Sequence, residues 1–106
     1  MAHNANYVEV RKRLRKFRDV KGLSLQNVEM LSRGEFMAVT LGSWGRGDRK
    51  PTLERLLYLC EDIYRIPLSA IISNNDEDFR EALAKEIMKS DKFANTFSPS
   101  IYKGGK

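Results

Sequence analysis

The stretch AVTLGSWGRGDRK, residues 38–50, decides which fold this sequence specifies. It begins with the apolar residues Val39, Leu41 and Trp44 at helical spacing, and it then places three glycines within six residues. Its last five residues, 46–50, include two arginines and a lysine. Because a glycine inside a helix costs about 1 kcal/mol relative to alanine, these glycines must serve a purpose. The stretch is either a glycine-rich loop for a nucleotide phosphate or a small, basic helix that lies against another surface.

The arrangement of the glycines favours the helix. A phosphate-binding loop follows a strand and precedes a helix, whose first N–H groups face the phosphate. Here no strand precedes the glycines, and the G-x-x-G-x-G spacing reverses the dinucleotide fingerprint. In a helix, Gly42 and Ser43 allow a close approach to a partner, Trp44 anchors the helix to the core, and Gly47 ends it in the left-handed conformation.

The segments before this helix predict two more. Residues 7–21 place Val10, Leu14 and Phe17 on one face and end at Gly22. The opposite face of this helix is basic, and it is either a solvated face or a phosphate-contacting one: Arg11, Lys12, Arg13, Arg15, Lys16 and Arg18.

The second predicted helix begins after Ser24, which is a suitable N-cap. Its inward residues are Leu25, Val28 and Leu31, and it ends near Gly34, which can adopt the left-handed turn conformation.

Three helices are predicted after the glycine-rich stretch. Pro51 breaks the chain and Thr52 caps a helix whose buried stripe is Leu53, Leu56, Cys60 and Ile63. A short helix follows, with Pro67 at its first turn. Acidic residues begin an amphipathic helix over about 76–90, and its apolar stripe is Phe79, Leu83 and Ile87. We expect the remaining tail to be mobile, since it contains Pro, Ser and Gly and has no apolar period.

Composition limits the classes of function. The chain has 106 residues, room for one small domain and an appended helix, and its net charge is +5. Residues 1–72 hold 13 Lys/Arg against 8 Asp/Glu, whereas residues 73–106 hold 6 of each, so the basic part is the first two thirds. A compact basic unit suggests a polyanionic partner. We expect a cytoplasmic protein, because there is one cysteine and no secretory or membrane-spanning apolar run.

No catalytic or metal chemistry is predicted. The single histidine, His3, is close to the N-terminus, so no histidine-based site is credible. Cys60 occupies a helix position, where we expect core packing and not a reactive thiol. We therefore expect no enzyme, no metal and no cofactor. The helix at the glycine-rich stretch is short and follows another helix after a tight turn. It belongs to a basic unit of five predicted helices. This is the helix-turn-helix arrangement, which reads DNA in the major groove.

At this point the sequence resembles a known family. Residues 13–72 resemble the Cro/cI-type (Xre-family, lambda-repressor-like) DNA-binding domain, and the pattern GLSL..VE..S.G.F.AVTLGSW.RGDR is most similar to BldD-like developmental regulators of actinobacteria. The resemblance implies an all-α fold: a five-helix DNA-binding domain over residues 7–72 and a C-terminal extension over residues 73–106. It also implies that the helix at about 38–46 reads DNA.

The resemblance assigns site residues by position. The residues expected to contact bases are Ala38, Val39, Thr40 and Ser43. The residues expected to contact phosphates are Arg33, Arg46, Arg49 and Lys50. The sequence departs from the family at Leu25, where many members have glutamine, and at Gly45, where an acid usually pairs with the arginine matching Arg18. Asp48 and Glu54 are the two candidates to replace that acid.

Two functions follow from these expectations. The first is a sequence-specific transcriptional regulator of double-stranded DNA, such as a repressor, associated with the nucleoid and acting as a homodimer, because one helix-turn-helix unit reads a half-site. The second is an antitoxin-like module that binds a protein through residues 76–106 and binds DNA only for autoregulation. The stripe of Phe79, Leu83 and Ile87 either forms the dimer contact or folds back onto the domain. The sequence identifies no small-molecule effector.

Overall fold

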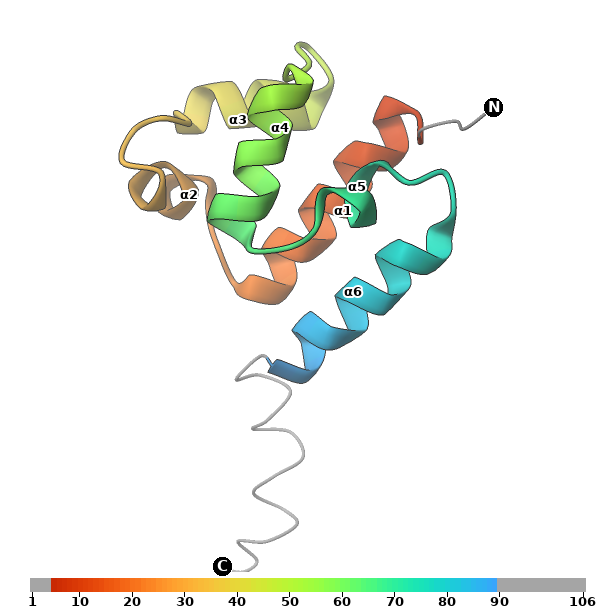
Figure 1. The fold of residues 1–106 in the computed structure, drawn as a ribbon. Coiled ribbons are helices and arrows are strands. Elements are labelled where there is room, and N and C mark those ends of the chain that lie inside the picture. The colour runs from red at the N-terminus through yellow and green to blue at the C-terminus, as the bar shows by residue number, and fades with distance from the viewer. Residues whose placement is uncertain (1–4, 90–106) are drawn as a thin grey trace, which may run out of the picture.

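The computed structural model describes residues 5–89, and this part of the chain is helical throughout, without a β-strand (Figure 1). The elements are α1 (Tyr7–Lys21), α2 (Leu25–Leu31), α3 (Ala38–Arg46), α4 (Leu53–Tyr58), the π-helix η1 (Leu59–Tyr64), α5 (Leu68–Ile72) and α6 (Asp76–Lys89). The predicted all-α fold is confirmed. None of the helices in residues 5–89 combines the length and the apolar character that a bilayer span needs.

The helix ends are set by local capping. The side chains of Asn6, Ser24 and Thr52 each accept a hydrogen bond from a backbone N–H in the first turn of the helix that follows. Gly22 and Gly47 end α1 and α3 with φ of 69° and 84°, in the left-handed region that glycine adopts without a steric cost. These caps are short-range, which is why the sequence predicts four of them, Gly22, Ser24, Gly47 and Thr52; the cap at Asn6 was not predicted.

The core lies among the helices α1 to α5 and η1. Its fully buried side chains include Phe17, Val28, Phe36, Leu59, Cys60 and Ile71. Trp44 is 6% exposed and meets the ring of Phe36 edge-on, with ring centroids 5.8 Å apart. The predicted anchoring role of Trp44 and the core position of Cys60 are therefore confirmed. Burial, with a smaller contribution from Glu61, raises the pKa of Cys60 to about 12, so the thiol is neutral.

Two residues that were predicted to face inward are at the surface instead. Leu31 is 56% exposed, because α2 ends there and Ser32 takes the inward position one turn after Val28. The Ser32 hydroxyl is satisfied there, since it donates to the carbonyl of Glu29 and accepts from the N–H of Phe36. Leu53 is 62% exposed, because it is the first residue of α4 and directly follows the exposed turn over residues 45–50.

The helix after Thr52 widens into a π-helix, which the sequence did not predict. From Leu59 onward the chain follows η1, whose wider turns rotate the side chains relative to an α-helix. The buried residues of the second half are therefore Leu59, Cys60 and Tyr64, while Ile63 is half-buried. Of the predicted stripe, only Leu56 and Cys60 are buried.

The last helix packs along the first. Figure 1 shows α6 beside α1, and the two run in the same direction, since Phe79 contacts Phe17 and Glu86 pairs with Lys21. The two phenyl rings meet edge-on, with centroids 5.6 Å apart and an interplanar angle of 87°. The Lys21–Glu86 ion pair measures 2.6 Å.

The expectations for His3 and for a mobile tail after α6 concern residues outside the described part of the chain.

Arg13 of α1 binds both the end of α5 and the start of α6. Its side chain is 3% exposed, and its Nη1 donates to the carbonyls of Ala70, Ile71 and Ser73 at the end of α5, at 2.7–3.4 Å. Its Nη2 pairs with Asp76 at 3.2 Å. The sequence placed Arg13 in the basic run, yet its spacing from Val10 and Phe17 also fits the buried face. That spacing is the signal that could have identified it.

Candidate nucleic-acid interface

The outer face of α3 carries the residues predicted to contact bases. Leu41 and Trp44 bury the inner face, and Val39 is 80% exposed on the outside. Ala38, Thr40 and Ser43 are half-buried along the flanks of the same helix. The four side chains are thus on one short rigid helix whose outer surface is small and partly polar. A surface of this kind can enter a groove and offer both hydroxyl and methyl groups to base edges.

The N-terminal end of α3 is fixed by a residue of α2. Met37, the N-cap, contributes no side-chain hydrogen bond, and the Ala38 N–H donates instead to Oε1 of Glu29 at 2.8 Å. This contact satisfies a helix-end donor and links the two helices of the helix-turn-helix unit. Sequence reasoning missed Glu29, because a cap that comes from nine residues away has no local pattern.

The C-terminal end of α3 gathers three of the four residues predicted to contact phosphates. Arg46 is exposed and pairs with Asp48 at 3.0 Å. Arg49 and Lys50 follow on the exposed turn before α4. Lys50 lies over the ring of Tyr7, with its Nζ 5.6 Å from the ring centroid. Three cations at one end of a groove-sized helix form a suitable contact for a phosphate backbone.

Tyr7 holds this turn in place, which the sequence did not predict. Its hydroxyl donates to the carbonyls of Trp44, at 3.0 Å, and Arg49, at 3.3 Å. Burial raises the pKa of Tyr7 although the nearby Arg11 opposes the shift, so the hydroxyl remains a donor at neutral pH.

The fourth predicted phosphate contact stands apart from the others. Arg33 lies in the turn after α2, on the N-terminal side of α3, where it is exposed and adopts a φ of 56°. A left-handed conformation is uncommon for a residue with a side chain. The structure therefore places basic side chains beyond both ends of α3, with Arg33 separate from the cluster of Arg46, Arg49 and Lys50.

Neither predicted acid replaces the missing partner of Arg18. Asp48 pairs with Arg46, and within residues 5–89 neither Asp48 nor Glu54 forms an ion pair with Arg18. Arg18 instead donates to the carbonyl of Leu23 at 2.8 Å. The open question of a substitute is thus answered in the negative for both acids, and the partner of Arg18 within residues 5–89 is a backbone oxygen.

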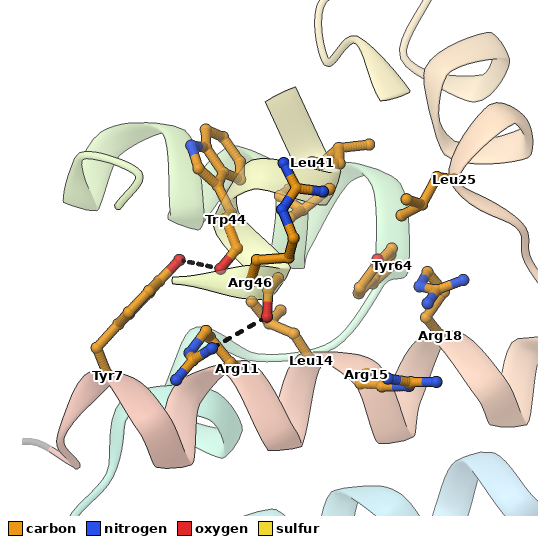
Figure 2. A pocket seen from close by; sticks show the side chains of 13 residues that line it. Tyr7, Arg11, Leu14, Arg15, Arg18, Leu25, Leu41, Trp44, Arg46 and Tyr64 are labelled. Atoms are coloured by element: carbon orange, nitrogen blue, oxygen red, sulfur yellow. Dashed lines mark hydrogen bonds between the residues drawn. The ribbon is translucent and has the colours of Figure 1, made fainter. Parts of the chain in front are cut away.

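A pocket of about 310 Å³ lies between α1, α2, α3 and η1, and Gly45 is among the residues that line it (Figure 2). Figure 2 shows Arg11, Arg15 and Arg18 on α1, with Arg46 on α3 and Leu25 on α2. A Cβ built on Gly42 would be 3.3 Å from Nη1 of Arg46 and 3.7 Å from Cδ1 of Leu25. The absence of a side chain at Gly42, which lines the pocket, therefore makes room for the side chains of Arg46 and Leu25.

Two of the three residues predicted to form the dimer contact pack against other parts of the same chain. Phe79 and Leu83 pack against the core of α1, and the guanidinium of Arg13 lies 5.4 Å from the centroid of the Phe79 ring. Ile87 is 36% exposed near the end of α6. For Phe79 and Leu83 the structure matches the fold-back alternative, whereas dimerisation stays a prediction.

The comparisons with known proteins point to one solved structure. No family model and no curated protein matches the chain. The crystal structure of the DNA-binding domain of BldD matches with a TM-score of 0.56 and 41% sequence identity, over 60% of this chain and 89% of that one.

Proposed function

The chain belongs to the same family as the DNA-binding domain of BldD, and from this premise we propose that it is a sequence-specific DNA-binding transcriptional regulator of the Xre type. In this proposal α3 enters the major groove, and Ala38, Val39, Thr40 and Ser43 meet the base edges. The proposed function is binding without a catalytic step, and its site of action is the nucleoid in the cytoplasm.

One observation carries this proposal most strongly. The helix α3 presents an outer face of small side chains and has basic residues beyond both ends, with Arg33 before it and Arg46, Arg49 and Lys50 at its end. This combination separates the two tasks of DNA recognition, since the face of α3 can read bases while the flanking cations bind phosphates. The contacts of Glu29 and Tyr7 hold both ends of α3 without occupying that outer face.

We test the proposal by selecting duplexes from a random pool with the purified chain. The expected result is an enriched motif with two half-sites about 10 base pairs apart, since each unit of a dimer reads one half-site. Val39→Glu is the matched variant, because it places a carboxylate on an outer-face residue of α3 that is 80% exposed and leaves the core unchanged. We expect this variant to enrich no motif. A wild-type selection without any enriched sequence contradicts the proposal.

Repression is the direction of regulation that we propose, and it has its own test. Genome-wide mapping of the binding sites, combined with transcript levels after deletion of the gene, connects each site to an effect. We expect the sites to overlap promoters and transcription from them to rise in the deletion strain. A fall in transcription at the bound promoters assigns activation instead.

Homodimerisation is part of the proposal, because a single unit reads only a half-site. Sedimentation of the full chain and of two variants tests it and locates the contact. Ile87→Asp alters the end of the α6 stripe, and Leu57→Asp alters the exposed apolar side of α4, where Leu57 is 41% exposed. We expect Ile87→Asp to dissociate the dimer. Dissociation by Leu57→Asp alone moves the contact to α4, and a monomeric wild type contradicts dimerisation.

A further inference from the structure

The pocket between α1, α2 and α3 combines an apolar lining with an unusual excess of positive charge. Its volume of about 310 Å³ is at the lower end of the range for small-molecule sites. Leucines and aromatic rings form the apolar part of the lining: Leu14, Leu25, Leu41, Trp44, Leu59 and Tyr64. These side chains come from four different elements, so the pocket is a product of the tertiary fold.

Four guanidinium groups line this pocket, and none of the described residues that line it carries a carboxylate, although Arg46 also pairs with Asp48 outside the lining. They belong to Arg11, Arg15 and Arg18 of α1 and to Arg46 of α3. Burial, the largest effect, raises the pKa of Tyr64 to about 12, so its hydroxyl adds no negative charge at neutral pH. Like charges that share a partly apolar space repel one another more strongly than they would in water. An anion in the pocket would remove this repulsion.

The hydrogen bonds of these arginines leave donors available to a ligand. Arg11 uses Nη1 for the carbonyl of Gly45, while its Nε is buried and has no partner among residues 5–89. Arg18 uses Nη1 for the carbonyl of Leu23. Because the Nε of Arg11 is inaccessible to solvent, a ligand in the pocket meets other donors. The N–H groups of Arg15 and the Nε and Nη2 of Arg18 have no hydrogen-bond acceptor within residues 5–89 and can donate to an anion.

We propose that this pocket binds a small organic anion that carries a carboxylate on a compact apolar body. The carboxylate accepts hydrogen bonds from the arginines, and the apolar body contacts the leucines and Trp44. Because Gly42, Gly45 and Arg46 are pocket residues on α3, the ligand adjoins the helix that we propose to read DNA. The pocket is thus an effector site, and this regulatory part of the inference rests on the proposed function.

A phosphodiester of the DNA backbone is a less suitable occupant. It supplies the negative charge but has no apolar body to cover the leucines and aromatic rings of the lining. The apolar lining is therefore the feature that selects an organic anion, and a small phosphodiester serves as the discriminating probe.

The binding experiment uses cyclohexanecarboxylate as the probe. Cyclohexanecarboxamide is its neutral analogue, and dimethyl phosphate represents the DNA backbone. Trp44 is the one tryptophan of the chain and lines the pocket, so its fluorescence reports occupancy locally. Backbone amide shifts at Gly42 and Gly45 provide a second readout. We expect saturable binding of the carboxylate, with the carboxamide and dimethyl phosphate at least about tenfold weaker, because each lacks one of the two recognition elements.

Position 45 offers a matched pair of variants. A Cβ on Gly45 meets nothing within 4 Å, so a longer side chain fits there. Gly45→Glu supplies the pocket with its own carboxylate, and Gly45→Gln adds nearly the same volume without the charge. We expect Gly45→Glu to weaken probe binding at least about tenfold and Gly45→Gln to change it less than threefold. Thermal unfolding confirms that both variants are folded.

Three results would overturn the inference. Equal binding of the carboxamide would make the pocket simply apolar, and equal binding of dimethyl phosphate would make it a DNA backbone contact. Unchanged probe binding in folded Gly45→Glu would place the probe elsewhere. These measurements need no DNA, so they stand whether or not the proposed function does. The regulatory part is tested separately: the carboxylate should change wild-type affinity for a selected duplex but leave that of Gly45→Glu unchanged, and an unchanged wild-type affinity removes the effector role.

Discussion

The two sides of α1 use the same residue type in opposite ways. On the side that faces α6, Arg13 is buried, and its guanidinium is satisfied by three carbonyls and by Asp76. On the side that faces α3, Arg11, Arg15 and Arg18 surround an open pocket that contains no carboxylate. The first side joins the helices into one body, whereas the second leaves positive charge available for a partner. The arginine that pairs with a carboxylate therefore stabilises the fold, and we propose that the three arginines without an ion pair among residues 5–89 contribute to binding.

The largest effect is expected on the side that faces α3, where Trp44 joins this helix to the core. Trp44→Ala removes a buried ring, and we expect it to lower the free energy of unfolding by about 3–5 kcal/mol. Such a loss is comparable to the whole stability of a small domain. Chemical denaturation followed by circular dichroism measures it. Near-wild-type stability would mean that the packing of α3 does not depend on this ring.

A pair of arginine substitutions tests the comparison directly. Arg13→Ala leaves the carbonyls at the end of α5 without this donor and removes one of the two arginines that pair with Asp76, and we expect the free energy of unfolding to fall by about 3 kcal/mol. Arg15→Ala removes an exposed side chain two residues later on the same helix, and we expect a loss below about 0.5 kcal/mol. Both are measured by urea denaturation. Equal losses would contradict the division of α1 into a structural side and a binding side.

A substitution on the outer face of α3 tests base reading without touching the core. Ser43→Ala removes one half-buried hydroxyl, and we expect the discrimination between bases at one or two positions to fall by about 1–3 kcal/mol. The melting temperature should not change, because no hydrogen bond of this hydroxyl supports the described fold. Binding to a set of single-base operator variants measures the effect. An unchanged preference at every position would remove Ser43 from the reading face.

The smallest effect concerns the phosphate contacts. Arg49→Ala should weaken binding to all duplexes similarly and reduce the slope of log K against log salt by about one unit. Arg80→Ala is the control, because Arg80 is an exposed arginine of the same charge on α6. Titrations at several salt concentrations give both slopes. Equal slopes for Arg49→Ala and the wild type would place Arg49 away from the DNA.

The sequence by itself determined which segments are helical and where most helices end, except for the start of α3, which Glu29 caps, and the widening into η1. The N-caps Asn6, Ser24 and Thr52 and the terminal glycines Gly22 and Gly47 act within one helical turn. Interactions of this range involve residues that are close together in the sequence. For this reason the predicted boundaries agree with the structure to within one or two residues for most helices. The similarity to a DNA-binding domain also came from consecutive residues, because the helix-turn-helix pattern is a local one.

Only the tertiary structure decided which faces are buried and where charge collects. Leu31 and Leu53 have the spacing of core residues, but no neighbouring element covers them, whereas Arg13 is covered by α5 and α6. Similarly, the pocket requires α1 to cross beneath α3, so that Arg11 and Arg46 line the same space although they are far apart in the sequence. The physical reason is that capping needs only nearby residues, whereas burial and charge clustering depend on partners 30 to 60 positions away.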